Sequence, residues 1–265
     1  CLDKGFLTRL RQFTQSIKPD FFLVGEVLHG DYNQWVNDQM CHSCTNYECY
    51  KGLYSSLNDL NLFEIAYSLK RQFGSESWCL YQGKHLLSFV DNHDVTRAAS
   101  ILLDRNHLPL LYGLLFGMPG IPCIYYGSEW AVEGARTRES DAPLRPCLEL
   151  AEMTGRDQTL CAHLSKLASI RAAFPALRHG DFENVVIKNE QLIYRRATPE
   201  QRVYVLLNLA EEEIHLEFPH QEPVLQDVLN GDAIFHNDGG RTWLPAPPCS
   251  ARILVGAPDR FAWSG

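Results

Sequence analysis

The sequence has few basic residues relative to acidic ones. There are 24 Lys and Arg against 32 Asp and Glu, for a formal net charge of -8 at pH 7. Proteins that bind nucleic acid neutralise phosphates with Lys and Arg, so this balance argues against a nucleic-acid partner. The chain also lacks a P-loop, a Gly-x-Gly-x-x-Gly motif, internal repeats and low-complexity segments. With 45% hydrophobic and 21% charged residues over 265 positions, its composition is that of a folded protein rather than a disordered one.

Cysteines are present, but without the dense, regular spacing of a disulfide-stapled secreted domain. Their number is nine, which is odd, and they are spread along the chain. We therefore expect reduced thiols and a cytoplasmic protein. Cys41 and Cys44, with Cys49 nearby, could form half of a tetrahedral zinc site, but no second Cys-x-x-Cys pair follows. We expect buried free thiols here and predict no metal site in this chain.

Long uncharged runs are absent except for Leu108–Gly127, which is long enough to cross a bilayer. Its prolines and glycines would leave backbone groups unpaired in lipid. We predict a buried helix over Leu108–Phe116, then a turn and a buried strand, and no membrane span. Residue 1 is Cys, and no targeting segment can be read at the start of the sequence.

Helices and apolar strands alternate over the first part of the chain. Asp3 can cap a helix with an apolar stripe formed by Phe6, Leu10, Phe13 and Ile17. Further stripes and apolar runs predict, in chain order, a strand at 21–27, a helix at 61–73, a strand at 86–90, a helix at 108–116, a strand at 121–126 and a helix from 159 to 174. This alternation is typical of parallel α/β folds, in which functional groups collect at the carboxyl ends of the strands.

The pattern changes after about Leu177. Short segments rich in β-branched residues are separated by turn residues, at 185–188, 192–196, 203–209, 214–218 and 252–255. We predict two domains, an α/β domain over residues 1–178 and an antiparallel β-domain over 179–265.

Two carboxylates follow two of the predicted parallel strands. Glu26 ends the strand at 21–27 among apolar neighbours, which would favour the protonated form that a general acid needs. Asp94 closes the polar segment 91–94 (Asp-Asn-His-Asp), directly after the strand at 86–90. Alternation along a strand cannot say which of these four side chains line a pocket. Glycoside cleavage uses two carboxyl groups in this way; the other interpretations are a surface glutamate and an ordinary polar turn.

Three segments, taken in order, closely resemble conserved segments of the alpha-amylase superfamily of glycoside hydrolases: 22–27 (FLVGEV), 89–94 (FVDNHD) and 120–129 (GIPCIYYGSE). The resemblance implies that they belong to the fifth, seventh and eighth strands of a (β/α)8 TIM barrel. Ser43–Tyr50 would be the sixth strand. The chain would then be the C-terminal half of the barrel, followed by the family's antiparallel β-sandwich.

The same resemblance implies roles for individual residues. Glu26 would be the catalytic acid/base, and Asp94 would bind the glucose ring and stabilise the transition state. His93 would contact the sugar, and His29 is a further candidate for substrate binding. Leu28 stands where many members of the family have Trp, which removes an aromatic stacking surface beside the acid.

The nucleophilic Asp of the family lies on the fourth strand, upstream of a segment like the one around Asp3. The resemblance therefore implies that the nucleophile and the first four strands are not part of these 265 residues. We expect a second polypeptide, or a longer product of the same gene, to supply them, because half a barrel exposes open sheet edges. No cofactor is expected in this chain, and calcium is possible in the missing N-terminal half.

The predicted function is that of a retaining hydrolase of α-1,4-glucans and maltodextrins, similar to amylases and neopullulanases, with an α-glucan oligosaccharide as its ligand. Without the nucleophile, this chain should be inactive alone. Two alternatives remain open. One is an inverting glycosidase that uses Glu26 and Asp94 as its acid and base. The other is a non-catalytic carbohydrate-binding or assembly subunit.

Overall fold

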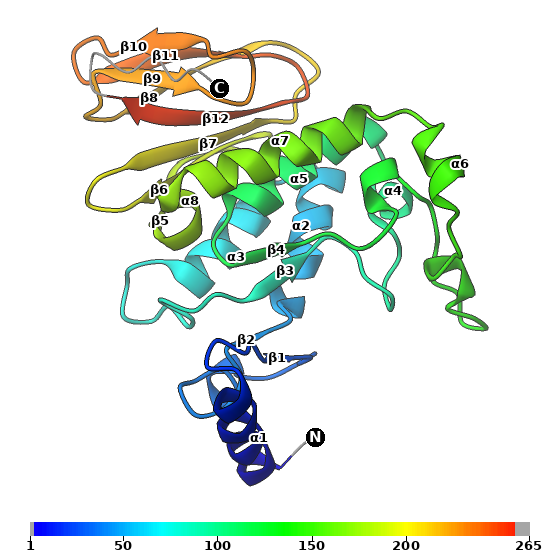
Figure 1. The fold of residues 1–265 in the computed structure, drawn as a ribbon. Helices are drawn as coiled ribbons and strands as arrows, with labels where there is room; N and C mark the ends of the chain where they lie inside the picture. The colour runs from blue at the N-terminus through cyan, green and yellow to red at the C-terminus, as the bar shows by residue number, and fades with distance from the viewer. Residues whose placement is uncertain (1–2, 258–265) are drawn as a thin grey trace.

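The computed structural model describes residues 3–257, so the last residues of the predicted β-domain, 258–265, lie outside the described part. Figure 1 shows helices and short strands in the N-terminal part and a strand-rich region in the C-terminal part. The helices are α1 (Lys4–Ile17), α2 (Tyr47–Asn58), α3 (Phe63–Phe73), α4 (Ala98–Ile101), α5 (Leu108–Gly117), α6 (Leu150–Thr154), α7 (Thr159–Ala173) and α8 (Pro175–His179). Short 3-10 helices are η1 (Tyr32–Gln34), η2 (Arg105–His107), η3 (Ser128–Trp130) and η4 (Ala142–Leu144).

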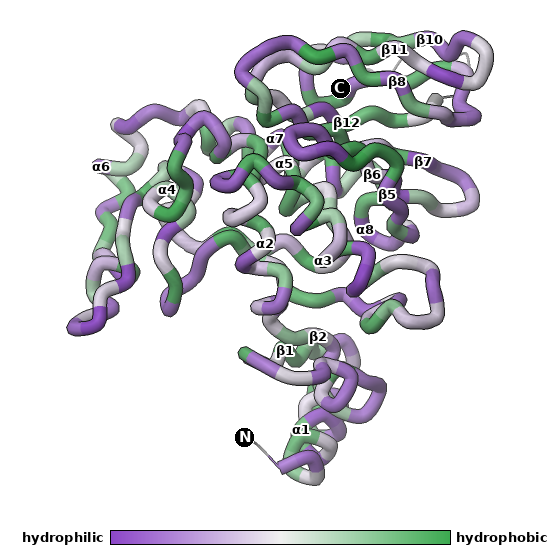
Figure 2. Tube along the Cα trace, turned by 180° about the vertical axis from the view of Figure 1, so that it is seen from behind, coloured by the Kyte–Doolittle hydropathy of each residue, from purple (hydrophilic) through white to green (hydrophobic). Residues whose placement is uncertain are grey.

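Helix α1 begins as the sequence predicts. Asp3 is the N-cap, and its side chain accepts a hydrogen bond of 2.9 Å from the Phe6 backbone N–H. The apolar stripe is nevertheless largely uncovered, because Phe6, Phe13 and Ile17 are 44%, 63% and 70% exposed. Figure 2 shows hydrophobic residues along α1 and beside β1 (Val24–Gly25), in the part of the chain that projects from the rest.

Four short strands lie between the helices along the chain: β1, β2 (Ser43–Cys44), β3 (Leu87–Phe89) and β4 (Ile121–Cys123). β1 pairs with β2 and β3 pairs with β4, both in parallel. A parallel bridge between Thr45 and Leu87 joins β2 to β3. The strands therefore form one row in chain order, and their carboxyl ends lie along the same edge.

The strand expected over Ser43–Tyr50 is wrong beyond Cys44. Asn46 accepts a hydrogen bond of 3.3 Å from the Cys49 backbone N–H and caps α2, so the chain is helical from Tyr47 onward. The Asn46 side chain starts a helix directly after the strand, and the family resemblance from which the longer strand was inferred did not reveal this cap.

The uncharged segment forms the buried helix α5, as predicted, and strand β4, which is shorter than the predicted strand at 121–126 and only half-buried. Almost every side chain of α5 is buried. At its end, the Arg171 guanidinium of α7 donates hydrogen bonds to the carbonyls of Phe116, Met118 and Gly120. In the described part of the chain, no helix combines the length and apolar character needed to cross a membrane.

The C-terminal region, called the β-region below, consists of the antiparallel strands β5 (Asp181–Ile187), β6 (Gln191–Ala197), β7 (Arg202–Asn208), β8 (Ile214–Pro219), β9 (Val224–Asp227), β10 (Ile234–His236), β11 (Arg241–Ala246) and β12 (Ser250–Ala257). Six of them form one sheet in the order β10-β9-β12-β7-β6-β5, and β8 pairs with β11. The strands predicted from the sequence are present; β9, β10 and β11 were not predicted, because β9 and β10 are short and β11 contains a proline and directly follows the turn residues Asn237–Gly240.

Both faces of the larger sheet are covered. Along β7, Val203 and Val205 belong to the core that contains α5, whereas Tyr204 and Leu206 pack with Phe218 of β8 and its neighbours in a second core. Successive side chains of a strand point to opposite faces, so one face packs on the helices and the other on the β8–β11 pair. The β-region therefore shares a continuous core with the helices (Figure 1).

A buried carboxylate ties the β8–β9 turn to strand β7. Glu222 accepts hydrogen bonds from Tyr204 Oη at 2.9 Å and Arg202 Nη1 at 3.2 Å, and its Oε2 lies 3.3 Å from His220 Nδ1. Burial by itself would raise the pKa of Glu222, but hydrogen bonds from His220 and Tyr204 and the Arg202 charge outweigh it and lower this pKa to about 2.

This lowered pKa predicts acid sensitivity. An unfolded Glu has a pKa of about 4.3, so the contribution of Glu222 to stability is complete above that pH and is lost as the pH falls toward 2. Between pH 5 and 2 the wild type should lose about 2 kcal/mol more unfolding free energy than Glu222→Gln. Urea unfolding at several pH values measures this difference. The exposed Glu139→Gln is the control; equal acid slopes in wild type and Glu222→Gln would contradict the assignment.

Candidate functional site

Three of the predicted site residues meet at the carboxyl edge of the parallel row. One ligand-capable atom each of Glu26, His93 and Asp94 lies within 4.8 Å of the other two. Glu26 follows β1, and His93 and Asp94 follow β3. Residues from strands that are not neighbours converge here because parallel strands all present their carboxyl ends at the same edge. His93 Nε2 lies 3.3 Å from Asp94 Oδ2.

A tight turn brings both His93 and Asp94 to the site. The Asp94 backbone N–H donates a hydrogen bond of 2.8 Å to Asn92 Oδ1, which is the pattern of an Asx turn. Because the chain turns directly after β3, the two-residue alternation of a strand no longer applies. The turn therefore shows which of residues 91–94 reach the site, which the spacing of the residues could not decide.

Asp91 instead points into the interior, where it is 2% exposed. Its carboxylate accepts hydrogen bonds from the Ala98 backbone N–H at 2.9 Å and from Ser128 Oγ at 2.8 Å. Burial raises the pKa of Asp91 from its usual value, with these hydrogen bonds opposing the shift. Asp91 therefore anchors the segment that carries His93 and Asp94 to α4 and η3.

Tyr47 and Asn92 complete the surroundings of Glu26. The Tyr47 hydroxyl donates a hydrogen bond of 3.3 Å to Glu26 Oε1 and accepts one of 2.8 Å from Asn92 Nδ2. Burial raises the pKa of Tyr47, so the hydroxyl keeps the proton that it donates. No sequence pattern pointed to Tyr47, which lay in the segment predicted to be strand.

Arg145 was also missed by sequence reasoning. Its Nη2 lies 2.8 Å from Asp94 Oδ1, and its Nε donates a hydrogen bond of 3.1 Å to the His93 carbonyl. The two contacts hold the turn from two sides and neutralise part of its negative charge. Arg145 lies in an irregular segment after η4, and no periodic pattern there points to it.

Apolar side chains lie around Glu26, as the sequence indicates, but the expectation that they bury it is wrong. Glu26 is exposed, and so are its apolar neighbours Phe22, Val24 and Leu28. The apolar run was interpreted as a strand covered on both faces, but the described residues leave these side chains uncovered. Glu26 and His29 both line a cavity of about 620 Å³. The His29 side chain is exposed, and it does not belong to the group formed by Glu26, His93 and Asp94.

The thiols of Cys41, Cys44 and Cys49 are free and buried, as predicted. Burial raises the pKa of each and brings that of Cys44 and Cys49 to about 12, so they are protonated and inert near neutral pH. They do not belong to either group that could hold a metal ion in the described part of the chain, Glu26–His93–Asp94 or Asp104–His107–Cys249. In the first of these groups, Asp94 is already paired with Arg145.

Comparison with known proteins relates this chain to alpha-amylases. The family model of the alpha amylase catalytic domain matches residues 2–175. Maltogenic alpha-amylase of Bacillus acidopullulyticus is 26% identical over 248 residues, which cover 89% of this chain and 40% of that protein. Cyclomaltodextrinase of Geobacillus thermopakistaniensis is 24% identical over 223 residues, which cover 82% of this chain and 37% of that protein.

Among solved structures, an Anoxybacillus alpha-amylase matches with a TM-score of 0.84 at 24% identity. The match covers 98% of this chain and 57% of that one. The likeness extends over the β-region as well as the helices, so the fold is that of these amylases. The chain spans about two fifths of the length of the two curated relatives.

The contacts of Asp91 predict a stability effect. Asp91→Ala leaves the buried Ala98 N–H and Ser128 hydroxyl without their acceptor and should cost about 2–3 kcal/mol of unfolding free energy. Asp91→Asn keeps one acceptor oxygen and should cost less. Denaturant unfolding compares both variants with Asp59→Ala, an exposed position expected to change stability by less than about 0.5 kcal/mol. An Ala variant as stable as the wild type would show that Asp91 does not anchor this turn.

Proposed function

The chain belongs to the alpha-amylase family, and we propose that it carries the acid/base part of the active site of a retaining glycoside hydrolase. The proposed substrates are α-1,4-linked glucans, in particular maltodextrins, in line with the names of the relatives. The observation that carries the proposal is the convergence of Glu26, His93 and Asp94 within 4.8 Å at one edge of the parallel strands.

In the proposed reaction, Glu26 protonates the glycosidic oxygen and later activates the water that releases the product. The hydrogen bond from the Tyr47 hydroxyl orients the Glu26 carboxylate. Asp94, held by Arg145, binds ring hydroxyls and stabilises the positive charge that develops on the sugar. His93 adds a sugar contact, and His29 lies in the adjoining cavity, where a further sugar unit would bind.

We further propose that β1 to β4 are the fifth to eighth strands of a (β/α)8 barrel. The first four strands, with the nucleophilic Asp, would come from a preceding segment or a second polypeptide. The exposed apolar stripe of α1 and the exposed Phe22 and Leu28 support this, since apolar side chains grouped in this way mark a surface that another element covers. Alone, residues 1–265 would lack the covalent step and would be inactive.

The geometry disfavours the inverting alternative. Inverting carboxyl pairs lie about 6.5–9.5 Å apart so that a water molecule fits between them. The closest oxygens of Glu26 and Asp94 lie within 4.8 Å, and Arg145 occupies one side of Asp94. The non-catalytic alternative, a carbohydrate-binding or assembly subunit, has no specific contact in its favour and is an outcome of the tests below.

This chain is proposed to need no cofactor of its own for the reaction; a calcium ion would belong to the other half of the barrel. A cytoplasmic location is proposed on the eight free cysteines of the described residues, since reduced thiols are typical of that compartment.

Removing the acid tests the proposal directly. In the complete enzyme, Glu26→Gln should lower kcat on maltoheptaose by about 10²–10⁴-fold, because Gln cannot transfer the proton. Reducing-sugar release measures kcat, and NMR of the first product should show the retained α-anomer. Glu139→Gln is the exposed control. Unchanged kcat in Glu26→Gln would remove Glu26 from the mechanism, and binding without hydrolysis by the wild type would favour the subunit alternative.

Tyr47→Phe separates orientation from proton transfer. Losing one hydrogen bond to Glu26 should lower kcat by about tenfold while leaving KM nearly unchanged. Full activity of this variant would show that Tyr47 does not position the acid.

Residues 1–265 produced alone test the missing half. The exposed α1 stripe should make this 30.2 kDa chain self-associate or bind an apolar dye, and it should release no sugar from maltoheptaose. A soluble, monodisperse monomer of that mass would contradict the need for a covering element.

A further inference from the structure

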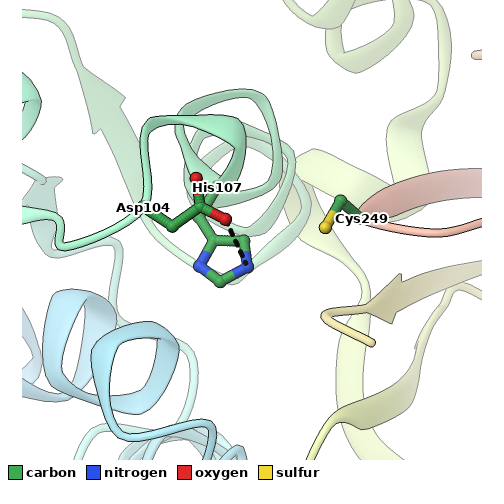
Figure 3. A group of neighbouring side chains, drawn as sticks. All are labelled: Asp104, His107 and Cys249. Atoms are coloured by element: carbon green, nitrogen blue, oxygen red, sulfur yellow. Dashed lines mark ion pairs between the residues drawn. The ribbon is translucent and has the colours of Figure 1, made fainter. Parts of the chain in front are cut away.

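We propose that Asp104, His107 and Cys249 form a site for a divalent transition metal of the zinc type, between the helices and the β-region. A carboxylate oxygen, an imidazole nitrogen and the sulfur all lie within 4.8 Å of one another. Asp104 and His107 come from the η2 segment, and Cys249 from the turn before β12. Figure 3 shows the Cys249 thiol directed away from the β-region strand that follows it and toward the His107 ring.

The imidazole of His107 has unused hydrogen-bonding capacity. His107 is 4% exposed, and its Nδ1 is buried without a hydrogen-bond partner among the described residues. Its Nε2 lies 3.9 Å from Asp104 Oδ2, which is too far for a hydrogen bond. A buried polar ring that makes no such bond costs free energy. A metal ion bound at Nε2 would use the ring nitrogen that faces Asp104 and would leave the ring proton on Nδ1, which has no partner among the described residues.

Asp104 is already oriented for such a site. Its Oδ1 accepts a hydrogen bond of 2.9 Å from the Asn106 backbone N–H at the start of η2. This bond fixes the carboxylate and leaves Oδ2 facing His107. In metal sites, ligating carboxylates are held by hydrogen bonds of this kind.

Negative charge collects around the thiol. Burial raises the pKa of Cys249, and the neighbouring carboxylates of Asp104 and Glu211 raise it further. A divalent cation would reverse this effect by compensating the thiolate. Glu211 also lines a cavity of about 620 Å³ with Asp104 and His107, and Glu190 and Glu212 add negative charge there. This acidic cavity would attract a cation and leave room for a fourth ligand, from Glu211 or water.

The donor set selects the ion. Thiolate, imidazole and carboxylate are the ligands of Zn²⁺, whereas Ca²⁺ and Mg²⁺ are bound through oxygen. Zinc–ligand bonds are about 2.0–2.3 Å long, which places tetrahedral donors about 3.3–3.8 Å apart, so donors that lie up to 4.8 Å apart would approach one another by about 1 Å on binding. On binding, a sulfur–metal bond forms and the thiol proton passes to solvent, with no change of oxidation state. Because the ligands come from two regions, the ion would link η2 to the β-region.

Cobalt(II) reports the site through its thiolate-to-metal charge-transfer absorption. The purified protein that contains this chain should bind one Co²⁺ with this absorption band, and Zn²⁺ should displace it. Cys249→Ser should lose the band, whereas the exposed Cys147→Ser should keep it. His107→Gln and Asp104→Asn, with folding checked by circular dichroism, should weaken Zn²⁺ binding by at least about 10–100-fold, the loss that follows removal of a group that only supports a ligand. Binding should also weaken as the pH falls, because protons compete for the ligands.

Stability gives a second readout. Zn²⁺ should raise the thermal midpoint of the wild type and of Cys147→Ser, but not of Cys249→Ser. The proposal is overturned if the wild type shows no charge-transfer band, or if Cys249→Ser keeps it. A band that survives in Cys249→Ser and disappears in Cys41→Ser would place the metal at the Cys-x-x-Cys pair instead. If Cys249→Ser does not fold, unchanged Zn²⁺ affinity in folded His107→Gln and Asp104→Asn overturns the proposal equally.

Discussion

The parallel pairing of four very short strands is the constraint on which the site depends. The register pairs Val24 with Ser43 and Leu87 with Ile121, and the bridge at Thr45 joins the two pairs. Each strand has only two or three residues, so a shift of one residue would turn the following side chains to the opposite face. The convergence of Glu26 with His93 and Asp94 is therefore a property of the row of strands and not of any single segment.

The row is supported unequally along its length. At the β4 end of the row, helix α5 is buried between α7 and the large sheet. Arg196 of β6 donates hydrogen bonds to the carbonyls of Gly117 and Leu177. Gly117 is needed here because a side chain would collide with Tyr194 of β6. At the other end, β1 has one neighbour, β2, among the described residues, and its apolar side chains are exposed. The chain is firmly packed where the β-region covers it and open beside Glu26.

Much of the architecture could be predicted from local chemistry. The cap at Asp3, the punctuated helix of Leu108–Gly117 and the change to antiparallel strands near Asp181 each follow from short-range patterns. The end of β2 was misjudged because the strand over Ser43–Tyr50 was inferred from the family resemblance, which does not reveal that Asn46 caps a helix from Tyr47 onward. The exposure of Glu26 was also misjudged, because burial depends on what covers a strand.

Local sequence indicates which groups are available: a carboxylate after one strand, an Asp-Asn-His-Asp segment after another, and an order of elements typical of a parallel fold. Which of these groups meet depends on tertiary packing. Tyr47 and Arg145 reach the site, and Asp91 turns away from it, because of contacts between residues far apart in the chain. Asp104, His107 and Cys249 come together for the same reason. Local patterns record periodicity and capping, whereas distances between remote residues depend on how the elements pack.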